Sequence, residues 1–338
     1  MKRFNMASTV NDVAKYANVS VGTVSRYLNG YRLRADNRRR IEEAIRTLEY
    51  RGNYVARSLR MRRTLTVGVV VPTLQDPYFS AVVTGVERGM GAHGYNLLIA
   101  DYADDPKLVS QKIENLLSKM VDAIVLFPRA IKEDFTLGDQ SLPVPLVVVD
   151  EDLPWVTCDK VLLDNVHGSY VATDRLIRGG HRKIAVVNGK RDSTVSLGRY
   201  EGYRLAMQDA GIGVEESLVD WGDFTIQGGY AAAKRLLSSE APPTALLVTN
   251  YQMTLGTVMV SYELNVRIPA FLSLIGFGNY ELSDIARPPL TVIDQPIDEI
   301  SNAITDILLR RIADEDTGEH QTIQMKPSLL MRESIRDL

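Results

Sequence analysis

Apolar residues near the start of the chain recur at the spacing of helix faces. They occupy positions i, i+3, i+4 and i+7 over residues 10–17, and they recur at helical spacing over 21–28 and 41–48. This pattern predicts three short amphipathic helices. Asn18 tolerates the left-handed backbone of a tight turn, and Ser20 is a suitable N-cap for the second helix. We therefore predict a helix-turn-helix near the N-terminus.

From residue 65 onward, short apolar runs alternate with stretches of helical length. Strand-like runs cover 66–72, 95–101, 123–127, 145–150, 160–164, 183–189, 245–250, 272–278 and 290–296. Helix-length patterns cover 79–92, 106–120, 166–178, 199–210, 227–238 and 297–312. Continuous apolar strands between helices indicate parallel sheets covered on both faces. These strands are too many for one open sheet, so we expect two α/β lobes with a cleft between them.

The charge of the chain is unevenly distributed. The 338 residues have a net charge of −3, yet residues 1–63 hold 15 Lys and Arg against five Asp and Glu, a net charge of +10. The other residues hold 24 basic and 37 acidic side chains, a net charge of −13. A basic segment on an acidic body favours a polyanion-binding module. The alternative is a solvated basic tail, but tails lack the apolar periodicity found here.

Composition also narrows the class of protein. No run of 18 apolar residues occurs, so no transmembrane helix is expected. Lys2 and Arg3 are not followed by the apolar region of a signal peptide. Cys158 is the single cysteine, which leaves no disulfide framework. These features favour a cytoplasmic protein.

The second predicted helix carries the candidates for reading DNA bases. In a helix-turn-helix, the first residues of this helix meet base edges in the major groove. Here they are Val21, Gly22 and Thr23 and, one turn on, Ser25 and Arg26. Arg26 can bond a guanine through two hydrogen bonds, and Val21 can contact a thymine methyl group. Two alternatives stay open: Val21 could belong to the core, and Gly22 could be merely a tolerated helix glycine.

Further basic residues suit the DNA backbone. Arg38, Arg39 and Arg40 are expected to meet phosphate or solvent. Residues 53–63 could form a short hinge helix, capped by Asn53, that folds on contact with DNA or a partner chain. Leu59 is apolar in this basic segment, as a minor-groove wedge needs to be, although an exposed leucine alone can be without function.

These segments resemble the lactose-repressor (LacI/GalR) family of bacterial transcription regulators. The matching residues are DVAKYANVSVGTVSRYLNG and RRRIEEAIRTLEYRGNYVARSL. The resemblance implies base reading by Val21, Gly22 and Arg26, phosphate contacts by Asn11, Thr23, Ser25 and Asn29, and minor-groove insertion by Leu59 beside Ala56 and Arg57. Ser20 and Asn53 are further candidate DNA contacts. Gly52 stands where the family usually has proline before Asn53, so we expect a more flexible hinge.

The body resembles the same family in VGVVVPTLQDPYFS, DNVHGSYVATDRLIRGGHRKIAVVNG, GRYEGY and RPPLTVIDQP. The resemblance implies an α/β body with the type I periplasmic-binding-protein fold, in which the chain crosses between two lobes more than once. The implied organisation is a helix-turn-helix domain at 1–52, a hinge at 53–64 and an effector-binding and dimerisation body at 65–338. Its lobes would be about 65–163 with 293–323, and about 164–292 with 324–338.

Effector contacts are expected at the carboxyl ends of the parallel strands, where ligands of open α/β sheets bind. That rule selects Asp76, Tyr78, Phe79, Asp150, Asn250 and Gln295. The resemblance implies contacts at the same positions and also at Arg199, Phe224 and Gly278. Three alternatives stay open: Asp150 could be a loop residue, Phe79 a core residue and Arg199 a surface charge.

The departures from the family pattern concern the charge of this pocket. The family commonly has an aspartate after the residue that corresponds to Asn250, where this chain has Tyr251. It also commonly has aspartates at the positions of Gly278 and Asn279. Two or three negative charges are therefore missing while Arg199 remains. Arginine pairs well with carboxylate and phosphate, so we hypothesise a sugar acid or a sugar phosphate as effector. A neutral sugar is the alternative, because repositioned waters could serve the same hydroxyls.

The sequence contains no recognisable catalytic constellation. His93, His167, His181 and His320 lack the spacing of metal ligands, and neither serine-hydrolase nor phosphate-binding glycine motifs occur. Asp164 before His167 is better explained as a helix N-cap than as part of an acid–base pair. Cys158 is expected in an exposed loop as an inert thiol. We expect no enzymatic activity, no metal and no cofactor.

The expected function is that of a transcriptional repressor of carbohydrate-related genes. Two chains would bind palindromic double-stranded operator DNA as a homodimer, under the control of a small-molecule effector that shifts the lobes. No terminal leucine heptad follows the body, so a dimer is expected instead of a tetramer. Three alternative functions can be distinguished from this one. A solute-binding protein would lack the basic head, a sugar-metabolising enzyme would turn over a sugar, and an architectural protein would bind DNA without sequence choice.

Overall fold

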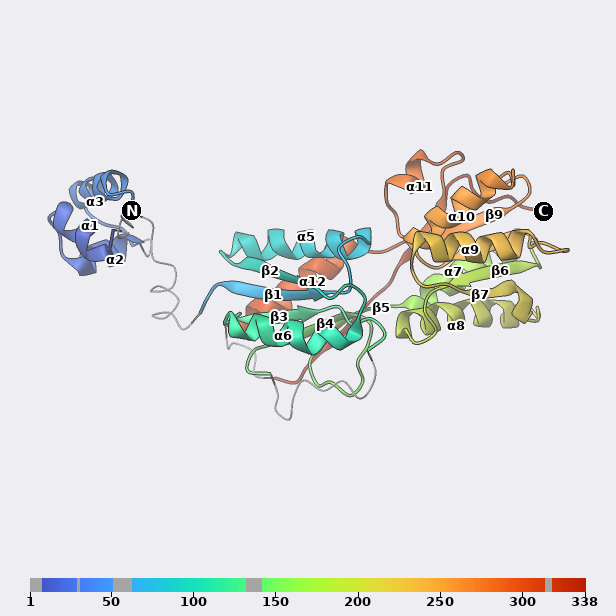
Figure 1. Ribbon diagram of the computed structural model, residues 1–338, viewed down its shortest axis with the longest axis horizontal. Coiled ribbons are helices and arrows are strands. Elements are labelled where there is room, and N and C mark those ends of the chain that lie inside the picture. Colours follow the sequence, from blue (N-terminus) through green and yellow to red (C-terminus); the bar gives the residue numbers. More distant parts are fainter. Residues whose placement is uncertain (1–7, 29–30, 51–62, 132–141, 314–317) are drawn as a thin grey trace, which may run out of the picture. The chain divides into compact units, whose positions relative to one another are not determined.

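The computed structural model describes residues 8–28, 31–50, 63–131, 142–313 and 318–338. The chain divides into two compact units, Met1–Thr64 and Leu65–Leu338. We call the first unit the head and the second the body. The head is helical, and the body contains two six-stranded sheets with helices packed on them (Figure 1).

Three helices build the head: α1 (Val10–Tyr16), α2 (Val21–Leu28) and α3 (Ala35–Thr47). Thr9 and Asp12 form a capping box at the start of α1. In the turn before α2, Asn18 has a φ of 52°, and Ser20 Oγ accepts a hydrogen bond from the Thr23 amide. The predicted helix-turn-helix and its N-cap are confirmed.

The head has a small core of its own. Its fully buried members come from all three helices and include Val13, Val24, Ile41 and Ala44. The helix α3 begins six residues before Ile41, where the apolar pattern starts, because its exposed first turns carry no apolar signal. The core fixes α2 against the other helices, so one face of α2 is buried and the opposite face is open to solvent.

The first lobe of the body is built on a parallel sheet with the strand order β11-β5-β4-β3-β1-β2. Its strands are β1 (Thr66–Val71), β2 (Asn96–Asp101), β3 (Ala123–Leu126), β4 (Leu146–Asp150), β5 (Asp159–Leu163) and β11 (Thr322–Met325). Its helices are α5 (Pro77–Ala92), the 3-10 turn η1 (Pro106–Leu108), α6 (Val109–Ser118) and α12 (Ile297–Ile312). The central strands β1, β3 and β4 are almost entirely buried.

The second lobe repeats this architecture with the order β12-β10-β9-β8-β6-β7. Its strands are β6 (Ile184–Asn188), β7 (Val219–Trp221), β8 (Ala245–Val248), β9 (Ser273–Phe277), β10 (Thr291–Asp294) and β12 (Ser328–Leu330). Its helices are α7 (Asn165–Arg178), α8 (Thr194–Asp209), η2 (Glu216–Leu218), α9 (Ile226–Leu237), α10 (Tyr251–Glu263) and α11 (Glu281–Ile285). Strand β12 pairs antiparallel with β10, and the other described pairs are parallel.

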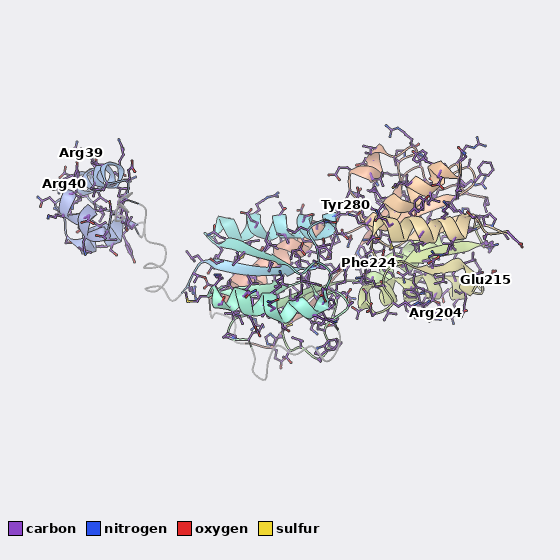
Figure 2. The ribbon with its side chains drawn as sticks, viewed as in Figure 1. Arg39, Arg40, Arg204, Glu215, Phe224 and Tyr280 are labelled. Carbon is purple, nitrogen blue, oxygen red and sulfur yellow. The ribbon has the colours of Figure 1, made fainter. Side chains whose placement is uncertain are left out.

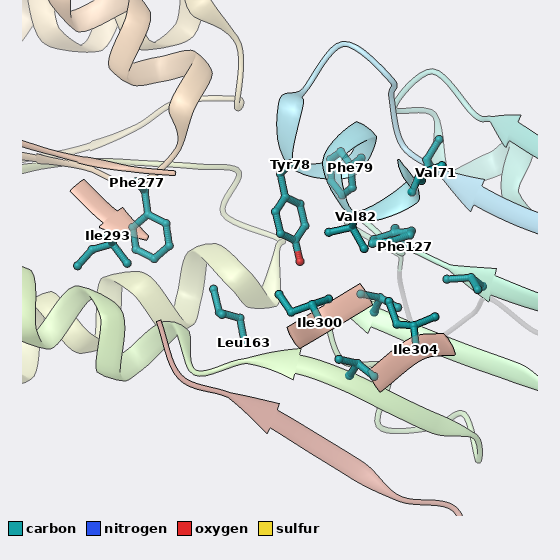
Figure 3. Close-up of a cluster of buried hydrophobic side chains, with 14 of the residues drawn as sticks. Val71, Tyr78, Phe79, Val82, Phe127, Leu163, Phe277, Ile293, Ile300 and Ile304 are labelled. Atoms are coloured by element: carbon teal, nitrogen blue, oxygen red, sulfur yellow. The ribbon is translucent and has the colours of Figure 1, made fainter. Parts of the chain in front are cut away.

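The chain passes between the lobes three times: after β5, after β10 and after β11. One buried apolar cluster runs through both lobes near these crossings and includes Val82 and Ile300 of lobe 1 and Phe277 and Ile293 of lobe 2 (Figure 3). Continuous packing of this kind couples the lobes mechanically, since a packed core transmits displacement.

Helix α12, which follows the second crossing, packs tightly on α5. A Cβ atom added at Gly85 of α5 would lie 2.3 Å from Ser301 Oγ of α12, and that hydroxyl donates a hydrogen bond to the Val82 carbonyl at 3.3 Å. A larger residue than glycine at position 85 would force the helices apart. Helix α12, where the chain has returned from lobe 2, is thereby fixed to α5, the helix that begins at the cleft.

The structure confirms each predicted strand and helix of the body to within a few residues, although α8 begins at Thr194, five residues before its predicted start. The strands β7, β11 and β12 and the helices α10 and α11 carry no such prediction. Three- and four-residue strands give too few positions for a pattern, and α10 is apolar on nearly every side. No helix in the described residues is long and apolar enough to cross a membrane.

Candidate functional site

The exposed face of α2 carries three of the residues predicted to meet DNA: Val21, Gly22 and Arg26. Val21 is 44% exposed, whereas Val24, three residues later, is fully buried. Ser20, Gly22 and Arg26 are exposed as well. Val21 is therefore not a core residue, and the alternative that placed it in the core is wrong. Asn11 on α1 is also exposed, and Thr23 and Ser25 are half-buried.

Arg26 has the freedom that a base-reading side chain needs. Its guanidinium carbon lies 5.8 Å from the centre of the exposed Tyr31 ring, within the range of a cation–π contact. Among the described residues, Arg26 has no hydrogen bond or ion pair through its side chain. Its donors thus remain available to a guanine edge.

Arg38 and Arg39 of α3 are exposed and weakly paired, whereas Arg40 is half-buried. Arg39 and Arg40 are labelled in Figure 2. Arg38 Nε lies 2.8 Å from Glu42 Oε1 and Arg39 Nη2 lies 3.4 Å from Asp36 Oδ1. The hydrogen bond from Arg38 lowers the pKa of the Glu42 carboxyl. Exposed pairs of this kind contribute little to stability, so these cations can be drawn to phosphate instead.

Five predicted DNA contacts lie outside the described residues: Asn29, Asn53, Ala56, Arg57 and Leu59. They stay predictions, as does the hinge over 53–64.

In the body, the expected effector contacts converge on one cavity between the two lobes. Eight of the nine line it: Asp76, Tyr78, Phe79, Asp150, Arg199, Phe224, Asn250 and Gln295. The cavity measures about 30 Å³, which is room for only a few water molecules. The cavity is therefore nearly filled by side chains, and a sugar-sized ligand requires the lobes or the lining residues to move apart.

Helix starts and backbone geometry hold several of these residues in place. Asp76 caps α5 by accepting a hydrogen bond from the Tyr78 amide at 3.0 Å, and Asn250 caps α10 by accepting one from the Met253 amide at 3.1 Å. Asn250 also donates through Nδ2 to Asp76 Oδ2 at 3.2 Å, from lobe 2 to lobe 1. Asp150 and Phe224 have φ angles of 75° and 68°. Left-handed backbone at two non-glycine residues of one pocket is typical of functional sites.

Arg199 is a buried cation without a close anion. It is 5% exposed and its guanidinium carbon lies 3.9 Å from the centre of the Phe277 ring. Its Nε donates to Asn165 Oδ1 at 2.8 Å, and its Nη1 donates to the Thr249 carbonyl. No carboxylate of the described residues lies within ion-pair distance of Arg199. Burial lowers the pKa of Arg199, and the charges of Asp150 and Tyr78 oppose that shift.

Two buried oxygen atoms of the pocket have no hydrogen-bond partner in the described structure: Asp150 Oδ1 and Tyr280 Oη. Burial raises the pKa of Asp150, and the positive charge of Arg199 opposes this. Burial also raises the pKa of Tyr280, so this phenol keeps its proton at neutral pH. Because orphaned buried polar atoms are costly, the pocket offers an acceptor and a donor to a ligand.

The pocket also contains residues that were not predicted from the sequence: Arg129, Glu151, Val195, Tyr251, Phe277 and Tyr280. Glu151 accepts hydrogen bonds from Ser193 Oγ at 2.5 Å and from the Ala130 amide at 3.2 Å. Burial raises the pKa of Glu151 to about 7. Arg129 follows β3 and Glu151 follows β4, so the rule that selects residues at the carboxyl ends of strands could have found both.

Gly278 is the one expected effector contact that does not line the cavity. Its φ of 93° suits glycine, and a Cβ atom at this position would lie 2.8 Å from the Tyr280 ring. The Tyr280 ring thus occupies the space that an acidic side chain at position 278 would need. Phe224 and Tyr280 are both labelled in Figure 2.

The remaining candidates for chemistry have structural roles. Asp164 Oδ1 accepts from the His167 amide at 2.9 Å and caps α7, as predicted. Cys158 is only 5% exposed, so its predicted place on an exposed loop is wrong; burial raises its pKa to about 11. Within the described residues, no group of His, Cys, Asp and Glu could hold a metal ion.

Comparison with known proteins agrees with this geometry. Residues 64–331 match the family described as "Periplasmic binding proteins and sugar binding domain of LacI family", and residues 9–53 match "Bacterial regulatory proteins, lacI family". The chain belongs to the LacI family. Its predicted fold is thereby confirmed: a helix-turn-helix domain and a two-lobed periplasmic-binding-protein-like body.

Individual members of the LacI family resemble the chain over nearly its whole length. It is 33% identical over 333 residues to the HTH-type transcriptional repressor PurR of Actinobacillus pleuropneumoniae serotype 5b (strain L20), with 98% of this chain and 99% of that protein covered. It is 33% identical over 334 residues to the ribose operon repressor of Haemophilus influenzae, with the same coverage. The operator-bound Lac repressor dimer with the anti-inducer ONPF shares the fold, with a TM-score of 0.88, 24% identity and coverage of 98% and 100%. This LacI-family protein is therefore a DNA-binding transcriptional repressor and not an enzyme.

Proposed function

We propose that this LacI-family protein represses carbohydrate-related genes in the cytoplasm by binding a palindromic operator as a homodimer, and that a small-molecule effector controls the binding. In this proposal, residues 1–52 bind the major groove, 53–64 form the hinge, and 65–338 bind the effector and dimerise. The observation that carries it is the open face of α2, where Val21, Gly22 and Arg26 are exposed on a cationic head.

The α2 face supports sequence choice, and the rest of the head supports affinity. Arg26 and Val21 offer a bidentate donor and an apolar contact to base edges. The exposed Asn11, Arg38 and Arg39 suit phosphate oxygens. Most of the affinity would come from phosphate contacts, so binding should weaken steeply with salt.

Exposed apolar side chains on the body support dimerisation. Leu98 and Ile99 are exposed on the edge strand β2 of lobe 1, and Met259, Tyr262 and Ile285 are exposed on α10 and α11 of lobe 2. Apolar side chains at an edge strand and along helix faces are typical of surfaces that a partner chain covers. A twofold dimer would bring two heads to two half-sites.

A binding-site selection with random duplexes tests the DNA-binding proposal directly. Full-length protein should enrich one palindromic motif with two identical half-sites. Recovery of unrelated sequences without a common motif would reject sequence-specific repression and favour an architectural DNA-binding role.

We further propose that the effector is a sugar acid or a sugar phosphate. Arg199 supports this because it is buried and has no carboxylate of the described residues within ion-pair distance. A ligand carboxylate or phosphate would supply the missing anion. Ligand hydroxyls would donate to Asp150 Oδ1 and accept from Tyr280 Oη, the two atoms without partners.

Calorimetry with matched sugars tests the charge of the effector. The protein should bind gluconate or a hexose phosphate more tightly than glucose or the parent hexose, and Arg199→Gln should remove the difference while the fold is kept. Tighter binding of the neutral sugar by the parent protein would rule out an anionic effector.

A further inference from the structure

Arg129 is a buried arginine that is anchored in lobe 1. It follows β3 and is 7% exposed. Its Nη1 lies 3.1 Å and 3.2 Å from the two carboxylate oxygens of Asp104, and its Nη2 lies 3.8 Å from Asp76 Oδ2. Two carboxylates of the same lobe therefore compensate the buried charge of this guanidinium.

The same guanidinium lies against two aromatic rings. Its central carbon is 4.8 Å from the ring centre of Phe79 and 4.8 Å from that of Phe224. Phe79 belongs to α5 of lobe 1, whereas Phe224 belongs to the segment between β7 and α9 of lobe 2. Both rings are buried, and a cation–π contact strengthens when it is shielded from water.

Arg129 thus joins the lobes through a single planar group. Asp76, its second carboxylate, also accepts from Asn250 of lobe 2 at 3.2 Å, so the Arg129 contacts and the Asn250 hydrogen bond share one residue. Phe224 is held at a φ of 68°, a backbone conformation that costs free energy in a non-glycine residue and persists only where its surroundings enforce it.

We propose that Asp76, Asp104, Phe79 and Phe224 form a guanidinium-binding site in which Arg129 acts as a clasp between the lobes. The proposal deepens the effector control proposed above and rests on it for its regulatory meaning. An effector that enters the cleft has to share this space with Arg129, because the cavity lined by it measures only about 30 Å³. Effector binding and the arrangement of the lobes are then coupled through one positioning residue.

Lysine cannot replace arginine in this role. The guanidinium carbon lies near both ring centres, while Nη1 donates to both oxygens of Asp104 and Nη2 lies 3.8 Å from Asp76 Oδ2. An ammonium group is a compact point charge with one nitrogen atom, so it cannot place separate nitrogen atoms at Asp104 and Asp76. Arg129→Lys therefore keeps the charge balance of the site and should lose the clasp.

Chemical rescue tests the guanidinium site without DNA and without knowledge of the effector. Full-length Arg129→Ala should melt several degrees below the parent protein, and low-millimolar methylguanidinium should restore most of that loss. The rescue should be absent in Arg129→Ala/Phe224→Leu and in the parent. Arg204→Ala, which removes a half-buried arginine paired with Glu201, is the matched control and should show neither loss nor rescue.

A distance measurement tests the clasp itself. Spin labels at Glu114→Cys of α6 and Glu215→Cys of lobe 2, both exposed sites, report the separation of the lobes when labelled chains are diluted with unlabelled ones. The parent should give one narrow distance. Arg129→Ala and Arg129→Lys should give a broader and longer distribution, and methylguanidinium should narrow it in Arg129→Ala only.

The outcomes separate the two proposals. Unchanged melting and lobe distances in both Arg129 variants, or equal effects of methylguanidinium on Arg129→Ala and Arg204→Ala, would overturn the clasp. If Arg129→Ala does not fold, Arg129→Lys and Phe224→Leu carry the distance measurement. If the selection with random duplexes yields no operator motif, the proposed repressor function is rejected. The melting temperatures and lobe distances would still decide whether the clasp exists.

Discussion

Val21 and Val24 show how much depends on single positions of α2. They are the same residue type three positions apart, yet Val24 lies in the head core and Val21 is exposed beside Arg26. An exposed valine at the start of α2 and, in its last turn, an arginine without an ion pair among the described residues are suited to base edges. In the proposed function, the reading of DNA would therefore depend on very few side chains.

Arg26→Ala should remove the base preference at one position in each half-site. The expected loss is about 1–3 kcal/mol on the preferred sequence, measured by fluorescence anisotropy on duplexes that carry each of the four bases there. Arg39→Ala is the comparison: it should weaken all duplexes alike and reduce the salt slope by about one. Retention of the base preference by Arg26→Ala would show that another residue reads this position.

Glu151 should make the stability of the body depend on pH. Burial raises its pKa from 4.5 to about 7, so the folded state binds this proton more tightly than the unfolded state. The resulting stabilisation is fully present below pH 4.5 and is lost as the pH rises through 7, with a slope of up to about 1.4 kcal/mol per pH unit.

Thermal unfolding between pH 5 and pH 8 measures this dependence. Glu151→Gln should flatten the decline of the melting temperature, whereas Glu215→Gln, which changes an exposed glutamate of lobe 2, should leave it as in the parent. Parallel curves for the parent and Glu151→Gln would contradict the protonation of Glu151 in the folded state.

The residues of the effector pocket were predictable where topology alone positions them. Asp76 and Asp150 follow parallel strands, and the carboxyl ends of such strands meet at one cleft. Tyr280 and Phe277 were not predicted, because their contacts depend on how α11 and β9 pack after folding. The contact of Arg129 with Phe224 joins residues from two lobes, and no local pattern in the chain indicates it.

At the scale of elements, caps and sheets carry the architecture. Asp76, Asp164 and Asn250 all cap helices that start at or near the cleft. Apolar runs revealed the central strands because parallel strands are buried on both faces. The edge strand β7 and the crossing strands β11 and β12 are three or four residues long and partly exposed, so the alternation that would mark them is too short to recognise.

Ser20→Ala should destabilise the start of α2 by about 1 kcal/mol, because the hydroxyl accepts the Thr23 amide. Hydrogen exchange of the α2 amides in the full-length protein measures the loss, which should appear as faster exchange in the first turn. Ser20→Asp keeps an acceptor and should exchange at the parent rate. Equal exchange of the alanine and aspartate variants would show that the cap contributes nothing.

At the scale of the whole molecule, an acidic two-lobed body carries a cationic head, and dimerisation would pair the heads. Ile285→Asp should weaken self-association, because it places a charge in the exposed apolar region of α11, where Ile285 is 68% exposed. Sedimentation equilibrium measures the effect. Leu197→Asp, at another exposed apolar residue of lobe 2, should leave association unchanged, and an unaltered dimer in both variants would place the interface elsewhere.

In the proposed function, two heads bind one symmetric site through phosphate and base contacts together. Affinity of the full-length protein for a selected palindrome, for one of its half-sites and for a scrambled duplex, measured over a range of salt concentrations, tests this most directly. We expect the tightest binding to the palindrome, weaker binding to the half-site and the scrambled duplex, and a steep linear fall of log affinity with log salt. Equal affinity for all three duplexes would contradict it.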